Sequence, residues 1–213
     1  MLKTVRIVFE KRGRAKYISH LDLTRTMTRV MRRAAIPLWY TEGFNRHPYL
    51  TFAAPLSLGF EGLRETMDLR LEEDMDYGEL VQRLNDAMPQ GLRAVSAAEA
   101  VLKPAALAAA RYELTFDCPA QRLESLMSRP EILVEKKTKK KVMKTVDIRP
   151  AFADAVIPPT ETGCVMAVTL PCSSEQTVNP SLLLSALNGE GEPPCRCRVL
   201  RLELLAADGS VFR

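Results

Sequence analysis

Apolar side chains recur along the chain with two different spacings, and the change from one spacing to the other predicts its elements. In residues 4–10 they occupy every second position, at Val5, Ile7 and Phe9, which predicts a strand. From Ser19 onward the spacing is that of one helix face, with apolar residues at positions 23, 27, 30, 31 and 34. The start of the chain therefore predicts a strand followed by an amphipathic helix.

The rest of the first half continues this change of spacing. The pattern predicts an extended stretch over 49–58, a turn over 59–64, a strand over 66–72, a helix that begins near Asp76 and a final strand over 92–101. The order strand, helix, strand, strand, helix, strand is the split βαβ arrangement of ferredoxin-like folds. The sequence therefore predicts a ferredoxin-like α+β domain at residues 1–103.

The second half again mixes the two spacings. Alternating stretches at 112–116, 164–170 and 199–205 predict strands, and apolar spacing at 119–127 and 180–187 predicts helices. Residues 132–135 and 142–148 are expected to form a hairpin around a run of lysines. We therefore expect a second α+β domain at 111–213, again ferredoxin-like, so the whole chain is assigned to the α+β class.

Charge is distributed unevenly over this plan. Residues 1–50 carry eleven basic and three acidic side chains, whereas residues 51–100 carry four basic and ten acidic ones, and the net charge of the chain is +4. A strongly basic block is typical of proteins that bind polyanions, although surfaces also segregate charge without such a partner.

Several function classes have no support in the sequence. It contains no phosphate-binding glycine loop, no dinucleotide fingerprint and no cysteine triplet for an iron–sulfur cluster. The five cysteines lack paired C-x-x-C spacing, so we expect reduced, buried thiols, no metal site and no cofactor held by this chain. No apolar run approaches the roughly 20 residues of a membrane helix, and no signal region is evident, so a cytoplasmic protein is expected.

The predicted first helix carries a basic face opposite its apolar stripe. Four arginines, unbroken by acidic residues, follow helical spacing on that face: Arg25, Arg29, Arg32 and Arg33. Guanidinium groups bind phosphate oxygens in pairs, which predicts contact with a nucleic-acid backbone. The alternative is an ordinary solvated helix face.

A compact loop at residues 41–48 is the second candidate site. It presents a ring and three polar side chains, namely Phe44, Asn45, Arg46 and His47, which are expected to contact nucleic acid. His20 and His47 are the only histidines and are candidate acid–base groups if they meet, because imidazole titrates near neutral pH. Alternatively, Asn45 and His47 only satisfy backbone groups of the loop.

The lysine run of the predicted hairpin is the third candidate site. Its members Lys136, Lys137, Lys139, Lys140, Lys141 and Lys144 are expected to contact a nucleic-acid backbone. Mutual repulsion makes the alternative, a merely solvated hairpin, less favourable.

Four segments of the sequence resemble the radical-SAM-linked proteins, bacterial proteins encoded beside, or fused behind, a radical S-adenosylmethionine enzyme. The segments are residues 16–22 (KYISHLD), 43–48 (GFNRHP), 55–59 (PLSLG) and 144–150 (KTVDIRP). Where the family often has a proline, this chain has Arg46. The resemblance implies a radical SAM enzyme as partner, and it implies that this partner carries the iron–sulfur cluster and S-adenosylmethionine.

These observations together predict an RNA-binding accessory protein, not an enzyme on its own, that presents an RNA or ribonucleoprotein substrate to the radical SAM partner. Two alternatives stay open: a metal-independent ribonuclease that uses His20 and His47, and a protein scaffold for the partner that binds no RNA.

Overall fold

The computed structural model describes residues 3–137, 142–160, 163–189 and 193–213. The chain divides into two compact units. Unit 1 comprises residues 1–107 and 201–213, and unit 2 comprises residues 108–200.

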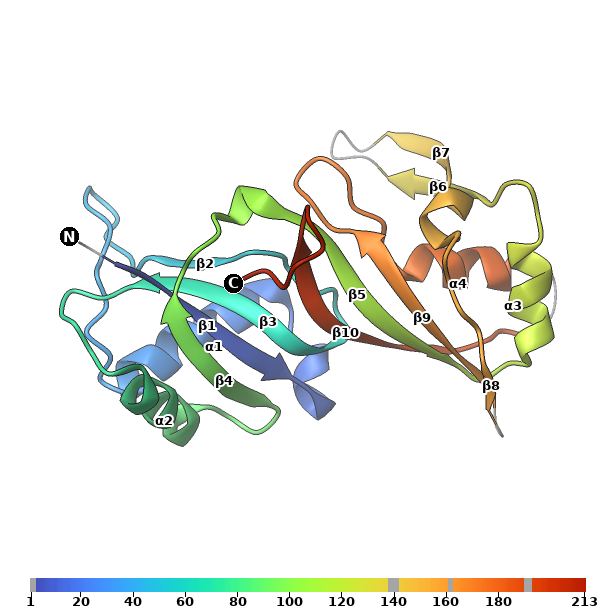
Figure 1. Ribbon diagram of the computed structural model, residues 1–213. Coiled ribbons are helices and arrows are strands. Elements are labelled where there is room, and N and C mark those ends of the chain that lie inside the picture. The colour runs from blue at the N-terminus through green and yellow to red at the C-terminus, as the bar shows by residue number, and fades with distance from the viewer. Residues whose placement is uncertain (1–2, 138–141, 161–162, 190–192) are drawn as a thin grey trace. The chain divides into compact units, whose positions relative to one another are not determined.

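Unit 1 is a sheet with two helices packed against it (Figure 1). Its elements are β1 (Thr4–Lys11), the 3-10 turn η1 (Gly13–Tyr17), α1 (His20–Arg33), β2 (Leu50–Phe52), β3 (Glu61–Arg70), α2 (Tyr77–Ala87), β4 (Leu92–Glu99), η2 (Pro104–Ala106) and the last part of β10 (Cys197–Ala206). The strand order is β4-β1-β3-β10, and β2 also pairs with β3. The pairs β1–β3, β1–β4 and β2–β3 are antiparallel.

The core of unit 1 follows from the two spacings. Val5 and Ile7 of β1 lie opposite Leu69 and Met67 of β3, and all four side chains are buried. The apolar stripe of α1 covers this face together with apolar residues of α2; the buried members are Leu23, Met27, Val30, Met31, Leu80 and Leu84. Burial of this surface away from water is the main force that holds the helices to the sheet.

The first helix begins at the predicted place. Ser19 is its N-cap, and the Ser19 hydroxyl accepts a hydrogen bond of 3.1 Å from the amide of Asp22 and donates one of 2.7 Å to the Asp22 carboxylate. The first of these bonds satisfies a backbone donor that has no partner within the helix, and the second holds the hydroxyl in place. The capped start predicted from Ser19 is thus confirmed.

The described part of unit 2 contains further strands and two α-helices. Its elements are β5 (Leu107–Phe116), α3 (Ala120–Met127), β6 (Leu133–Lys137), β7 (Met143–Asp147), η3 (Arg149–Phe152), β8 (Pro159–Thr160), β9 (Gly163–Pro171), α4 (Ser181–Asn188) and the first residues of β10. The strand order is β10-β5-β9-β8, while β6 and β7 form a separate antiparallel hairpin.

The α+β class is confirmed. In unit 1 the neighbouring strands and their antiparallel directions agree with the split βαβ order, whereas the ferredoxin-like assignment of each unit stays a prediction. The turn expected over 59–64 is shorter and earlier: it lies at Leu58 and Gly59, and β3 already begins at Glu61, where Gly62 lies opposite Lys11 of β1.

The end of the chain differs from the expected division at 1–103 and 111–213. Residues 201–213 belong to unit 1, because β10 lies beside β3 and two buried contacts hold the segment there. Arg201 pairs with Glu65, and the ring of Phe212 lies 4.0 Å below the guanidinium of Arg6. Both contacts join residues more than one hundred positions apart, which no local pattern reveals.

Candidate functional site

The four predicted arginines lie on the outer face of α1. Arg25, Arg29, Arg32 and Arg33 are all exposed, opposite the buried stripe. Arg25 lies 3.5 Å from the carboxylate of Asp22, and Arg33 donates to the carbonyl of Ala87 at the end of α2. An exposed ion pair of this length contributes little to stability. The arginine face, defined by these four residues, is therefore open to an anionic partner.

The Phe44 loop, residues 41–48, is closed at its base by its own backbone. The Thr41 amide donates to the carbonyl of His47 (2.9 Å), and the His47 amide donates to the Thr41 hydroxyl (3.2 Å). Gly43 has a φ of 114°, a conformation that glycine adopts without strain. Phe44 follows it with a relative exposure of 105%, which leaves both faces of the ring in water. The loop thus presents an aromatic ring from a closed frame.

His47 makes hydrogen bonds within this loop. Its Nδ1 lies 3.0 Å from the carbonyl oxygen of Asn45 and 3.1 Å from the hydroxyl of Thr41. A carbonyl oxygen only accepts hydrogen bonds, so Nδ1 carries the proton and Nε2 is the acceptor of the neutral ring. Asn45 takes part through its main chain. The alternative that His47 satisfies backbone groups of the loop is therefore supported.

A cation that lies over two neighbouring aromatic rings supports the base of the loop. The guanidinium of Arg70, at the end of β3, lies 4.3 Å from the ring centre of Tyr49 and 5.3 Å from that of Trp39. The Trp39 amide donates to the Arg70 carbonyl, and the Tyr49 amide donates to the Trp39 carbonyl. The sequence analysis missed this arrangement, because nothing local connects Arg70 to the only tryptophan.

His20 is the first residue of α1, and its ring meets the edge of Phe52 on β2 at 5.2 Å between centroids. Phe52 follows His47 by five residues, which span about 16 Å in an extended chain. Among the described residues, no hydrogen bond or ring contact joins His20 to His47. The structure therefore does not assemble the two histidines as an acid–base pair.

A buried charged cluster lies beneath the start of α1. Lys11, Glu65 and Arg201 are at most 3% exposed. Arg201 donates to both oxygens of Glu65, through Nε at 2.9 Å and through a second nitrogen, and also to the carbonyl of Ala54 at 2.8 Å. The Lys11 ammonium donates to the carbonyl of Ile18 at 3.1 Å. Burial lowers the pKa of Lys11, and the neighbouring Glu65 partly opposes this change.

The cluster joins two of the segments that carry the family resemblance. The Gly59 amide donates to the carbonyl of Lys16 (2.8 Å), which connects residues 55–59 to residues 16–22. Lys11 also donates to the carbonyl of Ile18, which belongs to residues 16–22. Lys11 is the last residue of β1 and faces Gly62 of β3, a position that buries its side chain.

His20 is expected to titrate with a pKa below the usual value of about 6.5. Partial burial lowers this pKa, and the positive charge of Lys11 lowers it further. The folded protein therefore favours the neutral ring, so the contribution of His20 to stability is present above pH 6.5 and is lost as the pH falls from there. NMR titration of the imidazole protons measures the shift.

The variant Lys11→Met separates the two causes of this shift. It removes the charge and keeps an apolar side chain of similar length, so the pKa of His20 should rise toward 6.5. An unchanged His20 titration in Lys11→Met would contradict the assigned influence of Lys11.

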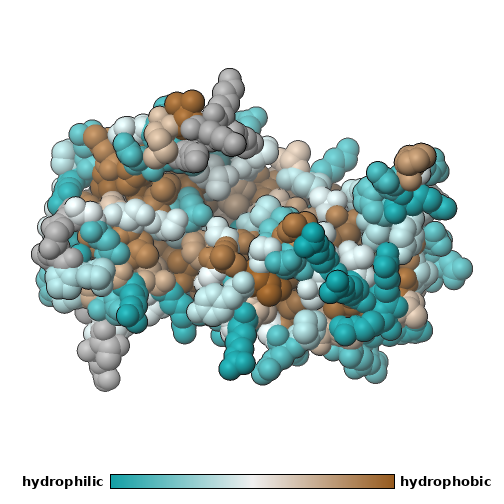
Figure 2. Space-filling model, turned by 180° about the vertical axis from the view of Figure 1, so that it is seen from behind, coloured by the Kyte–Doolittle hydropathy of each residue, from teal (hydrophilic) through white to brown (hydrophobic). Residues whose placement is uncertain are grey.

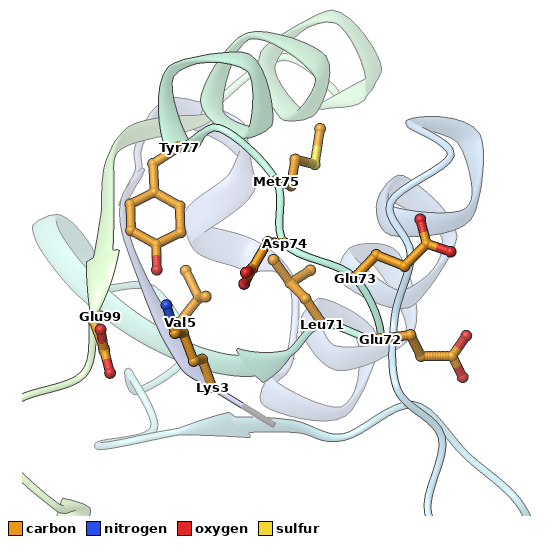
Figure 3. A pocket seen from close by; sticks show the side chains of 9 residues that line it. All are labelled: Lys3, Val5, Leu71, Glu72, Glu73, Asp74, Met75, Tyr77 and Glu99. Carbon is orange, nitrogen blue, oxygen red and sulfur yellow. The ribbon is translucent and has the colours of Figure 1, made fainter. Parts of the chain in front are cut away.

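An acidic cavity of about 550 Å³ lies at the other end of β1 (Figure 3). Four of its nine lining residues are acidic, and Lys3 and Tyr77 also line it; the acidic residues are Glu72, Glu73, Asp74 and Glu99. Like charges repel, so this cavity does not suit a polyanion. Seen from behind, hydrophilic side chains cover much of the surface (Figure 2).

The basic hairpin is described only in part. The expected hairpin is confirmed as β6–β7. Lys139, Lys140 and Lys141 lie outside the described residues, and so does the side chain of Lys137. Lys136 is half-buried, and its ammonium donates to the carbonyl of Thr177 at 2.6 Å. Part of its hydrogen-bonding capacity is therefore used within unit 2. Lys144 is exposed on β7.

Two general properties hold for the described part of the chain. It contains no group of three or more His, Cys, Asp or Glu side chains arranged to hold a metal ion. Its helices are too short or too polar for any of them to cross a membrane.

Residues 4–180 match the family described as "Uncharacterized protein conserved in bacteria (DUF2344)", and the chain belongs to this family. Among solved structures, the chain is similar to one described as an unknown protein from Galdieria sulphuraria, with 12% sequence identity over 94% of this chain and 99% of the other and a TM-score of 0.29. No curated protein matches the sequence.

Proposed function

We propose that this member of the DUF2344 family binds RNA through unit 1. The arginine face of α1 contacts the phosphates, and the Phe44 loop contacts a base. The observation that carries the proposal is the exposed Phe44 ring on a closed loop, because a monomeric protein gains no stability from a fully exposed aromatic side chain at that position.

The electrostatics of α1 support the first half of this proposal. Four guanidinium groups on 14 residues of helix present forked donors, and the described acid on the same helix is Asp22. Phosphate contacts of this kind release counterions and give affinity without sequence preference. The acidic cavity lies away from this face and is not part of the proposed site.

The Phe44 loop supports the second half. Single-stranded nucleic acids bind proteins by stacking unpaired bases on exposed rings beside a basic track. The Thr41–His47 hydrogen bonds and the contacts of Arg70 with Trp39 and Tyr49 hold the loop before any ligand arrives. This reduces the conformational entropy lost on binding. Arg46, exposed beside Phe44, adds a positive charge next to the ring.

The biological setting we propose is that of an accessory protein for a radical SAM enzyme. The resemblance of the four sequence segments supports this partner, which would carry the iron–sulfur cluster and S-adenosylmethionine. In that setting this chain presents an RNA or ribonucleoprotein substrate and performs no chemistry of its own.

Filter binding of the purified protein to a 20-nucleotide single-stranded RNA tests the proposal. We expect retention at 50 mM salt that falls steeply as the salt concentration rises. Single-stranded DNA of the same sequence measures the preference for RNA. Absence of any binding at 50 mM salt would sink the proposal.

Replacing Phe44 with alanine should weaken RNA binding about 5- to 150-fold, since stacking of a base on an aromatic ring contributes roughly 1–3 kcal/mol. Thermal stability should stay unchanged, because the ring makes no buried contact. Val101→Ala, which removes another exposed apolar side chain of unit 1, is the matched control. Equal affinity of Phe44→Ala and the control would rule out the stacking role.

The scaffold alternative is favoured by a different observation. Tyr17, Leu21 and Leu58 are 58–67% exposed near the start of α1, and the bond from Gly59 to Lys16 places Leu58 close to Tyr17. Exposed apolar clusters often contact another protein. Co-purification of the radical SAM enzyme without RNA, lost in Tyr17→Ser/Leu58→Ser, would favour a scaffold over an RNA-binding protein.

A ribonuclease has less support, because His20 and His47 are not brought together. Incubation of RNA with the protein in the presence of a chelator tests it directly. Cleavage by the wild type that disappears in both His20→Ala and His47→Ala would re-establish this function.

A further inference from the structure

Cysteines that are far apart in the sequence meet in unit 2. The sulfur atoms of Cys118 and Cys195 are 2.9 Å apart, although 77 positions separate the two residues. The thiol of Cys164 on β9 donates to the carbonyl of Cys118 at 3.5 Å. Both sulfurs of the close pair belong to buried residues, at 5% and 4% exposure. The other two cysteines of this unit, Cys172 and Cys197, are not part of the close pair.

The backbone holds the two segments of the pair face to face. The Asp117 amide donates to the carbonyl of Arg196 at 3.2 Å, and the Arg196 amide donates to the Asp117 carboxylate at 2.6 Å. These two bonds join the residues that lie immediately next to the two cysteines in the chain. The reciprocal contact fixes the distance between the segments without any covalent bond.

A second clamp fixes Cys195 itself. The side-chain amide of Asn188, the last residue of α4, accepts from the Cys195 amide at 2.8 Å and donates to the Cys195 carbonyl at 2.9 Å. With both ends of the residue held, its sulfur has few positions open to it. The pair is therefore oriented in advance and lies less than 1 Å beyond the roughly 2.05 Å length of a disulfide bond.

We propose that Cys118 and Cys195 are an oxidation site that closes to an intramolecular disulfide when a small hydroperoxide reaches unit 2. A metal-thiolate site is the less favourable interpretation, because the described part of the chain has no group of three ligands with suitable geometry. Hydroperoxides are small enough to enter a buried site that excludes larger oxidants.

The chemistry balances with hydrogen peroxide as the oxidant. One thiolate attacks a peroxide oxygen, the O–O bond breaks, and a sulfenic acid forms while hydroxide takes up the proton that the thiol released and leaves as water. The second sulfur then attacks the sulfenic sulfur. The S–S bond forms, the S–O bond breaks, and the oxygen leaves with two protons as a second water. Two thiols are oxidised by two electrons, and one peroxide is reduced.

Burial controls how fast this reaction starts. It raises the pKa of Cys164 to about 11 and that of Cys197 to about 12, and the pKa of Cys195 is also raised, through burial first and through its contact with Cys118 second. The thiolate is the nucleophile, so the thiols react slowly at neutral pH and faster at alkaline pH. The experiment is therefore run at pH 8.5.

The test treats the full-length protein with hydrogen peroxide, alkylates the remaining thiols and maps the peptides by mass spectrometry. We expect the wild type to lose two of its five thiols, a mass decrease of about 2 Da, and one linkage between the Cys118 and Cys195 peptides. The thermal midpoint should rise on the order of 10 °C and return with a reductant, because the bond closes a long loop of the unfolded chain.

Three variants complete the experiment. Cys118→Ala and Cys195→Ala should keep their four remaining thiols, whereas Cys172→Ala, a buried cysteine outside the pair, should still lose two. The linkage map of the wild type keeps the proposal testable if a variant fails to fold. Five intact thiols after treatment, a bond between another pair such as Cys195 and Cys197, or sulfinic acid without a cross-link would overturn it.

Discussion

Replacing Glu65 with alanine should lower the free energy of unfolding by about 3–5 kcal/mol, the usual cost of leaving a buried charge without its partner. The carboxylate lies between two buried cations, Arg201 and Lys11, and is 3% exposed. Its removal leaves two positive charges in the interior without the carboxylate that Arg201 binds. Urea denaturation followed by circular dichroism measures the loss.

Two comparisons make this prediction specific. Glu72→Ala removes an exposed glutamate of unit 1 and should change stability by no more than about 0.5 kcal/mol. The double variant Glu65→Ala/Arg201→Met should cost less than the sum of the single changes, because the two side chains share one interaction. A loss for Glu65→Ala as small as that of the control would show that the cluster does not hold the sheet together.

The effect should extend to the candidate site. Arg201 also bonds the Ala54 carbonyl, and Lys11 bonds the Ile18 carbonyl, so the cluster connects β1, β3 and β10 to the segment that begins α1. The arginine face depends on the orientation of that helix. A destabilised cluster is therefore expected to loosen the proposed RNA site as well as the fold.

Local patterns predicted the parts of the protein that depend on neighbours in sequence. The start of α1 at Ser19 follows from a cap and from helical spacing, both of which act within a few residues, and the exposed arginine face follows from the same spacing. The strands of the sheet follow from alternation. Their order β4-β1-β3 agrees with the order of elements, since the crossover rules leave few arrangements for it.

Local patterns do not predict contacts between residues that are far apart in the sequence. Arg201 and Glu65 are 136 positions apart, and nothing near either residue indicates the other. Lys11 begins a run rich in basic residues, 11–16, and only its register with Gly62 of β3 shows that it is buried. The Cys118–Cys195 pair has no spacing motif, because the two segments meet only when β5 and β10 are neighbours.

The histidines show a different limit. Their proximity in the chain, within one stretch of 28 residues, suggested one site. The stretch includes a helix, and a 14-residue helix is about 21 Å long. His20 is the first residue of this helix, and the chain returns to it at Phe52, five residues after His47, so nearness in sequence does not by itself bring the two imidazole rings together.

Replacing all four residues of the arginine face with glutamine should weaken RNA binding by on the order of 10²–10³-fold at 0.1 M salt. The logarithm of the affinity falls with the logarithm of the salt concentration, with a slope of about −0.7 for each phosphate of a single strand that the protein contacts. Loss of four contacts therefore reduces the magnitude of this slope by about 3. Extrapolated from 1 M to 0.1 M salt, that change in slope gives the stated loss. Filter binding between 50 mM and 300 mM salt measures both quantities.

A control with the same change in net charge decides whether position matters. Four exposed basic residues of unit 1 outside α1 and the Phe44 loop are replaced with glutamine: Lys3, Arg64, Arg93 and Lys103. If RNA binds along α1, this control keeps most of its affinity and its salt slope. Equal losses in the two quadruple variants would mean that overall charge attracts RNA, and the arginine face would then have no special role. The exposure of its four side chains favours the first result, because each guanidinium reaches a phosphate without breaking a buried contact.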